Sequence, residues 1–76
     1  MKAHDILRRL WAVDKREVLL IDIHNLMVAE RLVYPFQRKN WLNYLLVNKF
    51  LIRDESNDQV YIINRMNIAK ELGLVL

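Results

Sequence analysis

The chain of 76 residues lacks cysteine and threonine, and it contains one serine, one proline and one glycine. Without cysteine, no disulfide framework, thiolate metal site or cysteine nucleophile can form. One glycine, Gly73, cannot build a glycine-rich phosphate loop, and the one serine, Ser56, lies in an expected exposed turn. These absences argue against an enzyme, so we expect no catalytic residues and no cofactor.

Long apolar segments are also missing. The longest uninterrupted apolar runs have four residues, as in 18–21, whereas a membrane span needs about 20. The segment 1–5 is charged and does not resemble a secretory signal. We therefore expect a cytoplasmic protein without a membrane partner.

Charge of one sign is only slightly in excess. Twelve Lys and Arg residues against nine Asp and Glu residues give a net charge of +3, and neither half of the chain carries a basic block. A nucleic-acid partner would thus need a positive face assembled by the fold. The apolar fraction of 54% is high for so short a chain, which indicates that some apolar surface meets a second copy.

Metal-ligating residues are sparse. Asp22 and His24 stand two positions apart, and His4 is the only other histidine. A stable site needs three or four ligands with supporting hydrogen bonds. We therefore interpret these residues as ordinary polar side chains and expect no metal.

Hydrophobic periodicity and turn chemistry divide the chain, which we interpret as a single domain over 1–76. Apolar residues at three-four spacing, Pro35 at a helix start, Asn64 as a cap and Gly73 as a stop mark the helices. The expected helices span 2–13, about 24–33, 35–49 and 65–72, and a hairpin pairs 50–53 with 59–63.

Residues 18–23 are ambiguous, because their short β-branched run suits either a buried strand or the first turns of a helix. We favour a short strand followed by the helix at 24–33. The alternative is one long helix over 15–33, which would produce a purely helical dimer.

This order of elements resembles the winged-helix superfamily. The segment 48–53 is similar to the point where a recognition helix ends and the wing begins, and 60–67 is similar to a second wing strand with a capped helix. Asn67 departs from that pattern, since many small winged helices have glycine there. The chain also resembles the small, basic, cysteine-free winged helices of archaeal viruses and plasmids. The resemblance implies an α+β winged helix-turn-helix with a C-terminal helix after the wing.

The implied function is sequence-specific binding of double-stranded DNA by a regulator of transcription or replication, with helix 35–49 in the major groove. Asparagine and glutamine amides can pair with adenine through one donor and one acceptor. The expected base contacts are Gln37, Asn40, Asn43 and Tyr44. The expected phosphate contacts are Arg38, Lys39, Arg8 and Arg9, although the last two could instead form a solvated face paired with nearby carboxylates.

The wing favours an alternative function. Asp54, Glu55 and Asp58 surround its turn, where Arg53 is the only cation, and phosphate would repel these carboxylates. The same fold could therefore serve as a protein-protein interaction module without DNA binding. In either case we expect a homodimer, with Leu72, Leu74, Val75 and Leu76 as its interface. Val28, Leu32 or the first helix are competing interfaces.

Overall fold

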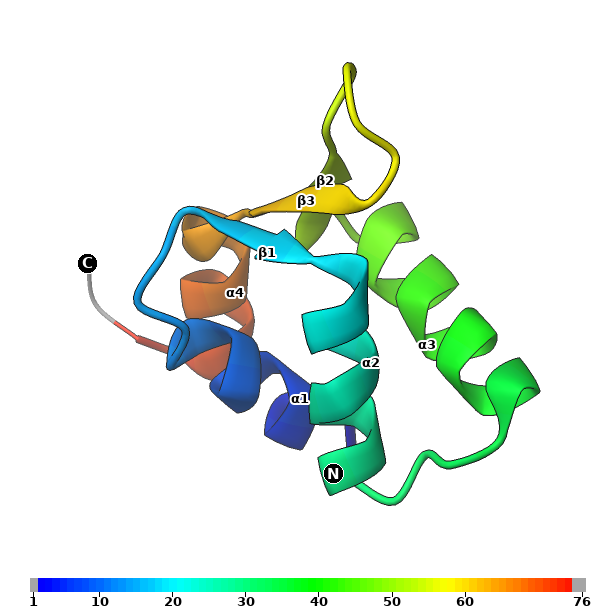
Figure 1. The fold of residues 1–76 in the computed structure, drawn as a ribbon. Helices are drawn as coiled ribbons and strands as arrows, with labels where there is room; N and C mark the ends of the chain where they lie inside the picture. The colour runs from blue at the N-terminus through cyan, green and yellow to red at the C-terminus, as the bar shows by residue number, and fades with distance from the viewer. Residues whose placement is uncertain (1, 75–76) are drawn as a thin grey trace.

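Helices lie on one side of a small antiparallel sheet in the computed structural model, which describes residues 2–74 (Figure 1). The helices are α1 (Lys2–Trp11), α2 (Leu20–Ala29), α3 (Pro35–Val47) and α4 (Arg65–Leu72). The strands are β1 (Glu17–Leu19), β2 (Leu51–Arg53) and β3 (Val60–Ile63), in the spatial order β1-β3-β2. The predicted α+β class, with a hairpin followed by a C-terminal helix, is confirmed.

Local signals placed the start of α3 and both ends of α4 correctly. Pro35 is the first residue of α3, where its missing N–H has no helical partner to lose. Gly73 ends α4 with φ 74°, a left-handed conformation that glycine adopts without a Cβ clash. The ends of α1 and α3 fall about two residues before the predicted ones.

The boundary between β1 and α2 differs from the prediction. The strand ends at Leu19, and the helix already begins at Leu20 instead of 24. Glu17 pairs with Ile62 and Leu19 pairs with Val60, where β3 begins, and a last hydrogen bond joins the Leu20 N–H to the Gln59 carbonyl at 2.8 Å. Ile23 and Met27 are both fully buried, four residues apart, on the inner face of α2. The continuous helix over 15–33 is therefore excluded.

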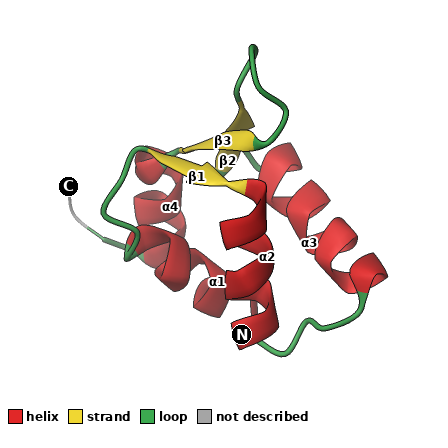
Figure 2. Cartoon of the chain, in the orientation of Figure 1, coloured by secondary structure: helices red, strands yellow, loops and turns green. Residues whose placement is uncertain are grey.

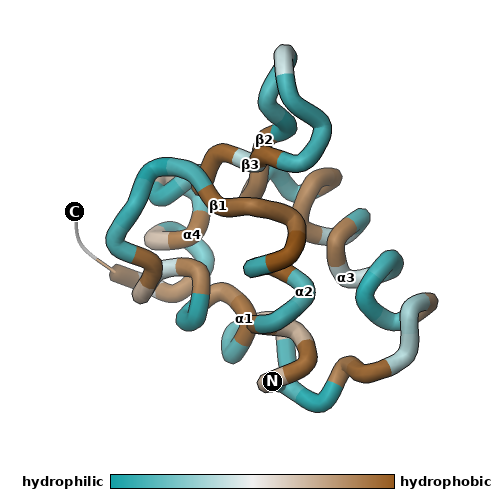
Figure 3. The backbone as a smooth tube through the Cα atoms, in the orientation of Figure 1, coloured by the Kyte–Doolittle hydropathy of each residue, from teal (hydrophilic) through white to brown (hydrophobic). Residues whose placement is uncertain are grey.

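β2 and β3 form the wing hairpin, and the loop that joins them projects from the sheet (Figure 2). In its turn the backbone N–H of Gln59 donates to Asn57 Oδ1 at 2.9 Å, and the Ser56 hydroxyl donates to Asp54 Oδ2 at 3.0 Å. Figure 3 shows that this tip is hydrophilic. Local polar contacts thus shape the turn, as its composition predicts.

Every helix and strand contributes to one apolar core. Its buried members are Ile6, Leu7, Leu10, Val18, Ile23, Met27, Leu32, Leu45, Phe50, Leu51, Tyr61, Ile63 and Ile68. No polar or charged residue of the described segment is buried. None of the helices between residues 2 and 74 has the length and apolar character that a bilayer crossing needs.

Candidate nucleic-acid interface

One side of α3 faces outward with a polar surface. Leu45 is fully buried on the opposite side, and Trp41 and Leu42 are partly buried against the core. Lys39, Asn40 and Asn43 are exposed. Both amides on this side of α3 are therefore uncovered.

A depression of about 300 Å³ joins this side of α3 to the base of the wing. Its lining residues are Lys39, Asn40, Leu42, Asn43, Leu46 and Arg53. The two cations come from different elements, because Lys39 belongs to α3 and Arg53 ends β2. Two amides, two positive charges and a short apolar floor thus meet at one surface.

Sequence reasoning assigned Arg53 only to the wing and missed its place beside α3. The strand register explains this position of Arg53, since it pairs with Tyr61 at the end of a three-residue strand that follows α3 directly. Its guanidinium lies 3.5 Å from the Tyr61 hydroxyl and 5.9 Å from the ring centroid. The short link between helix 35–49 and strand 50–53 was the available signal.

The asparagines on α3 and around its C-terminal end form two groups with different contacts. The side-chain amides of Asn48, Asn64 and Asn67 donate to backbone carbonyls where α3 ends, with Asn64 bonding to Lys49 at 2.8 Å. Asn40 and Asn43 are exposed and make no such contact within residues 2–74. Their donors and acceptors are therefore available to a ligand.

Gln37 and Arg38 have intramolecular roles at the start of α3. Gln37 Oε1 accepts a hydrogen bond from the backbone N–H of Tyr34 at 3.3 Å, a contact that caps the helix. The guanidinium of Arg38 donates to the carbonyls of Leu32 and Val33, at 3.4 and 2.6 Å. Both side chains thus stabilise the turn between α2 and α3, and they are only partly exposed.

Tyr44 lies on the core side of α3 rather than among the amides. Its ring meets Trp41 edge-on, with centroids 5.3 Å apart, and it packs against Phe50 at 6.0 Å. The expectation that it shares the outward face with Asn40 and Asn43 is not met. The reason is that these two aromatic partners hold the ring in a partly buried position.

Arg8 and Arg9 are on α1, away from α3. Figure 1 shows α2 lying between these two helices. Arg8 approaches Asp5 at 3.5 Å, and Arg9 pairs with Glu30 at the end of α2. The structure therefore does not bring these arginines together with the polar side of α3, and both have carboxylate partners.

The four residues expected at the dimer interface differ in their exposure and in whether the structure describes them. Leu72 packs against the core, so its side chain is largely used within the domain. Leu74 is 43% exposed. Val75 and Leu76 lie outside the described residues. Among the competing residues, Leu32 is buried whereas Val28 is exposed.

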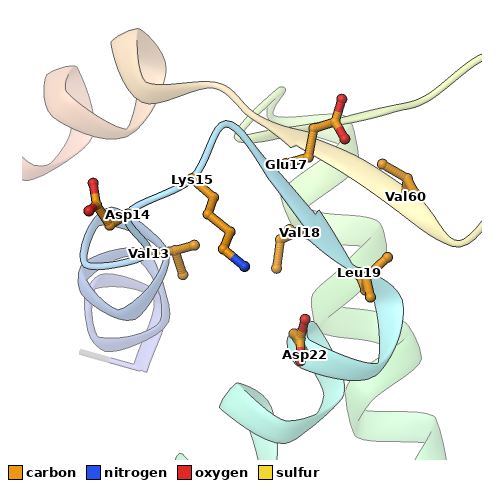
Figure 4. Close-up of a pocket in the computed structure, with 8 residues that line it drawn as sticks. All are labelled: Val13, Asp14, Lys15, Glu17, Val18, Leu19, Asp22 and Val60. Carbon is orange, nitrogen blue, oxygen red and sulfur yellow. The ribbon is translucent and has the colours of Figure 1, made fainter.

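A second pocket, of about 420 Å³, lies beside β1 (Figure 4). Asp14, Glu17 and Asp22 contribute its carboxylates and Lys15 its cation, over an apolar wall that includes Val18. In the close-up, Asp14 and Glu17 project from separate parts of the rim. Within residues 2–74, no group of three histidine or acidic side chains is placed to hold a metal ion.

The histidines are equally dispersed. His4 Nε2 lies 3.8 Å from a carboxylate oxygen of Glu71, which joins α1 to α4, and His24 is on α2.

The surface with the most convergent chemistry is therefore the polar side of α3. The chain matches no protein-family model, and comparisons with curated proteins and with solved structures find no relative.

Proposed function

We propose that this chain is a winged helix-turn-helix protein that binds double-stranded DNA and regulates transcription or replication in the cytoplasm. The observation that carries the proposal is the depression where Lys39 and Arg53 flank Asn40 and Asn43. In this arrangement α2 and α3 form the helix-turn-helix, and α3 is the element that enters the major groove.

The chemistry of the depression suits both components of DNA recognition. Lys39 and Arg53 would neutralise phosphates, which supplies affinity without reading sequence. Asn40 and Asn43 would contact base edges through their amides. Gln37 and Arg38 would support them by holding the start of α3.

The acidic tip of the wing has a separate consequence. Asp54, Glu55 and Asp58 surround it, and like-charge repulsion would hold them away from phosphate. We therefore propose that the wing contacts DNA only through its base, at Arg53. The charged tip would also discourage the hairpin from pairing with other chains.

The test compares four proteins in fluorescence anisotropy with labelled duplexes: wild type, Asn40→Ala with Asn43→Ala, Lys39→Ala with Arg53→Ala, and Arg8→Ala. The asparagine variant should bind all sequences similarly. The cation variant should bind every sequence more weakly, and the slope of log affinity against log salt should fall by about two. Arg8→Ala is the matched control, because Arg8 lies on α1 beside Asp5.

Circular dichroism would confirm folding, since all the substituted side chains are exposed. Unchanged binding of the asparagine variant would show that α3 is not the reading helix. Binding that does not weaken with salt would contradict the proposal as a whole.

The rival function is a protein-interaction module on the same fold. It is favoured by the exposed aromatic pair Tyr34 and Phe36, whose stacked rings have centroids 5.9 Å apart. A protein partner would depend on these rings and on the acidic wing. Loss of partner binding in Tyr34→Ala, together with no affinity for duplex DNA at low salt, would establish this alternative.

A further inference from the structure

Four exposed residues of α3 form a continuous outward line, which we call the α3 stripe: Phe36, Asn40, Asn43 and Val47. Their spacing of four, three and four residues places them on one helical face. Phe36 is 64% exposed and Val47 is 68% exposed, and both amides between them are exposed. The stripe thus presents two amides bracketed by two apolar side chains.

Within residues 2–74, neither apolar end of the stripe belongs to the core or packs against it. The core is built by the other side of α3, through Leu45 and its neighbours. Phe36 contacts another exposed ring, Tyr34, which helps to hold it in place. Exposing a phenylalanine and a valine leaves apolar area in water, so a ligand that covers them would gain free energy.

Each base pair presents a distinct pattern in the major groove. Adenine offers an acceptor and a donor that match an asparagine amide, and thymine offers a methyl group that matches an apolar side chain. Guanine is best read by arginine or lysine, and cytosine by a carboxylate. The α3 stripe contains amides and apolar groups but neither a cation nor a carboxylate, so its chemistry matches A·T pairs.

We infer that the α3 stripe selects A·T-rich duplex DNA, with Asn40 and Asn43 on adenines and Phe36 and Val47 on thymine methyl groups. This inference rests on the proposed function. Lys39 and Arg53 line the same depression as Asn40 and Asn43 of the stripe, where they would hold phosphates rather than guanines. At 1.5 Å per residue the stripe is roughly 16 Å long, which corresponds to about five base pairs.

The pattern is less suited to a protein groove. A helix that docks into such a groove uses apolar anchors one or two turns apart on a continuous face. Here Phe36 and Val47 are about three turns apart, and the polar amides of Asn40 and Asn43 separate them. Two cations on the flank also complement a polyanion.

The test begins with selection of bound duplexes from a random pool, which should enrich an A·T core of about five base pairs. In the selected duplex, replacing thymine by deoxyuridine removes the C5 methyl group and keeps the pairing. Each contacted methyl group should account for about fourfold in wild-type affinity. Replacing adenine by 7-deazaadenine removes the N7 acceptor and should weaken binding at least about fivefold for each contacted base.

The variants assign each effect to a residue. Phe36→Ala and Val47→Ala should each lose part of the deoxyuridine effect, and Asn40→Ala or Asn43→Ala should lose part of the deazaadenine effect. Met66→Ala is the matched control, because Met66 is 60% exposed on α4, outside the stripe. It should retain both effects in full.

The outcomes separate this inference from the proposed function. Salt-dependent duplex binding that enriches G·C pairs, or that is indifferent to deoxyuridine, would overturn the inference and leave the proposed function intact. Absence of duplex binding at low salt would overturn both. An A·T core whose deoxyuridine effect persists in full in the double variant F36A/V47A would overturn the assignment of the apolar ends.

Discussion

Three helices of the described segment are followed by a left-handed residue: Arg31 after α2, Lys49 after α3 and Gly73 after α4. Gly73 follows α4 with φ 74°, and Lys49 follows α3 with φ 60°. A left-handed backbone costs an L-residue about 1–2 kcal/mol, and glycine avoids this cost while losing more entropy on folding. A Cβ at Gly73 would meet no atom within 4 Å, so conformation alone decides its effect.

At this residue scale, Lys49→Gly should raise the free energy of unfolding by roughly 0.5–1 kcal/mol, and Gly73→Ala should lower it by a similar amount. Urea unfolding with an unchanged m-value would measure both shifts. Lys49→Ala is the control, since it keeps the Cβ and should leave stability nearly unchanged. A destabilised Lys49→Gly variant would contradict this account.

At the scale of elements, Arg65, the first residue of α4, binds the loop between α1 and β1. Its guanidinium donates to the carbonyls of Trp11 at 3.0 Å, Val13, and Lys15 at 2.9 Å. It also lies over the Trp11 ring, 5.6 Å from the centroid. Arg65 therefore holds a loop that the sequence marks only as a polar break.

We predict that Arg65→Met lowers the free energy of unfolding by about 2–3 kcal/mol, because several charge-assisted hydrogen bonds are lost. Arg65→Lys should recover only part of this loss, since an ammonium group lacks the planar fork that reaches several carbonyls. Urea unfolding gives the magnitudes. The control is Arg8→Met, which breaks one exposed pair on α1 and should change stability by less than about 0.5 kcal/mol.

Hydrogen exchange would locate the effect of Arg65. The Ile63 amide donates to the Arg16 carbonyl at 2.9 Å, so it reports on the attachment of the loop to β3. Its protection should fall in Arg65→Met more than the protection of α3. An Arg65→Lys variant as stable as wild type would show that charge alone is responsible.

At the scale of the whole molecule, many large apolar side chains remain exposed outside the core. Ten large apolar side chains of the described segment are at least 43% exposed, including Ile21, Ile52 and Leu74. Leu74 extends the chain past α4, and its backbone N–H donates to Ala69 at 2.8 Å. We propose that this end of the molecule contributes to a homodimer.

Truncation after Gly73 should accordingly shift the mass from dimer to monomer in light scattering. Within the described segment the last buried core residue is Ala69, and both it and Leu72 are retained, so the shortened chain should still fold. Circular dichroism checks that point. Ile21→Ala serves as control, since it removes an exposed apolar side chain from α2 without shortening the chain. An unaltered mass after truncation would place the interface elsewhere.

Much of the fold can be predicted from short segments of the sequence. Pro35 determines where α3 begins and Gly73 where α4 ends, because each restricts or permits backbone angles at its own position. The outward direction of Asn40 and Asn43 follows from helical spacing against Leu45. These features depend on neighbours within a few residues, so no knowledge of the tertiary structure is needed to predict them.

Only the tertiary structure decided the features that depend on residues distant in sequence. The short β1 ends at Leu19, opposite the first residue of β3, and only the Leu20 N–H still bonds across, to the Gln59 carbonyl. Tyr44 faces the core because Phe50 and Trp41 pack against its ring. Arg53 lies beside α3 because the strand register places it next to the depression there. These features depend on which segments pack together when the chain folds. Local propensity does not specify contacts between residues that are far apart in the sequence.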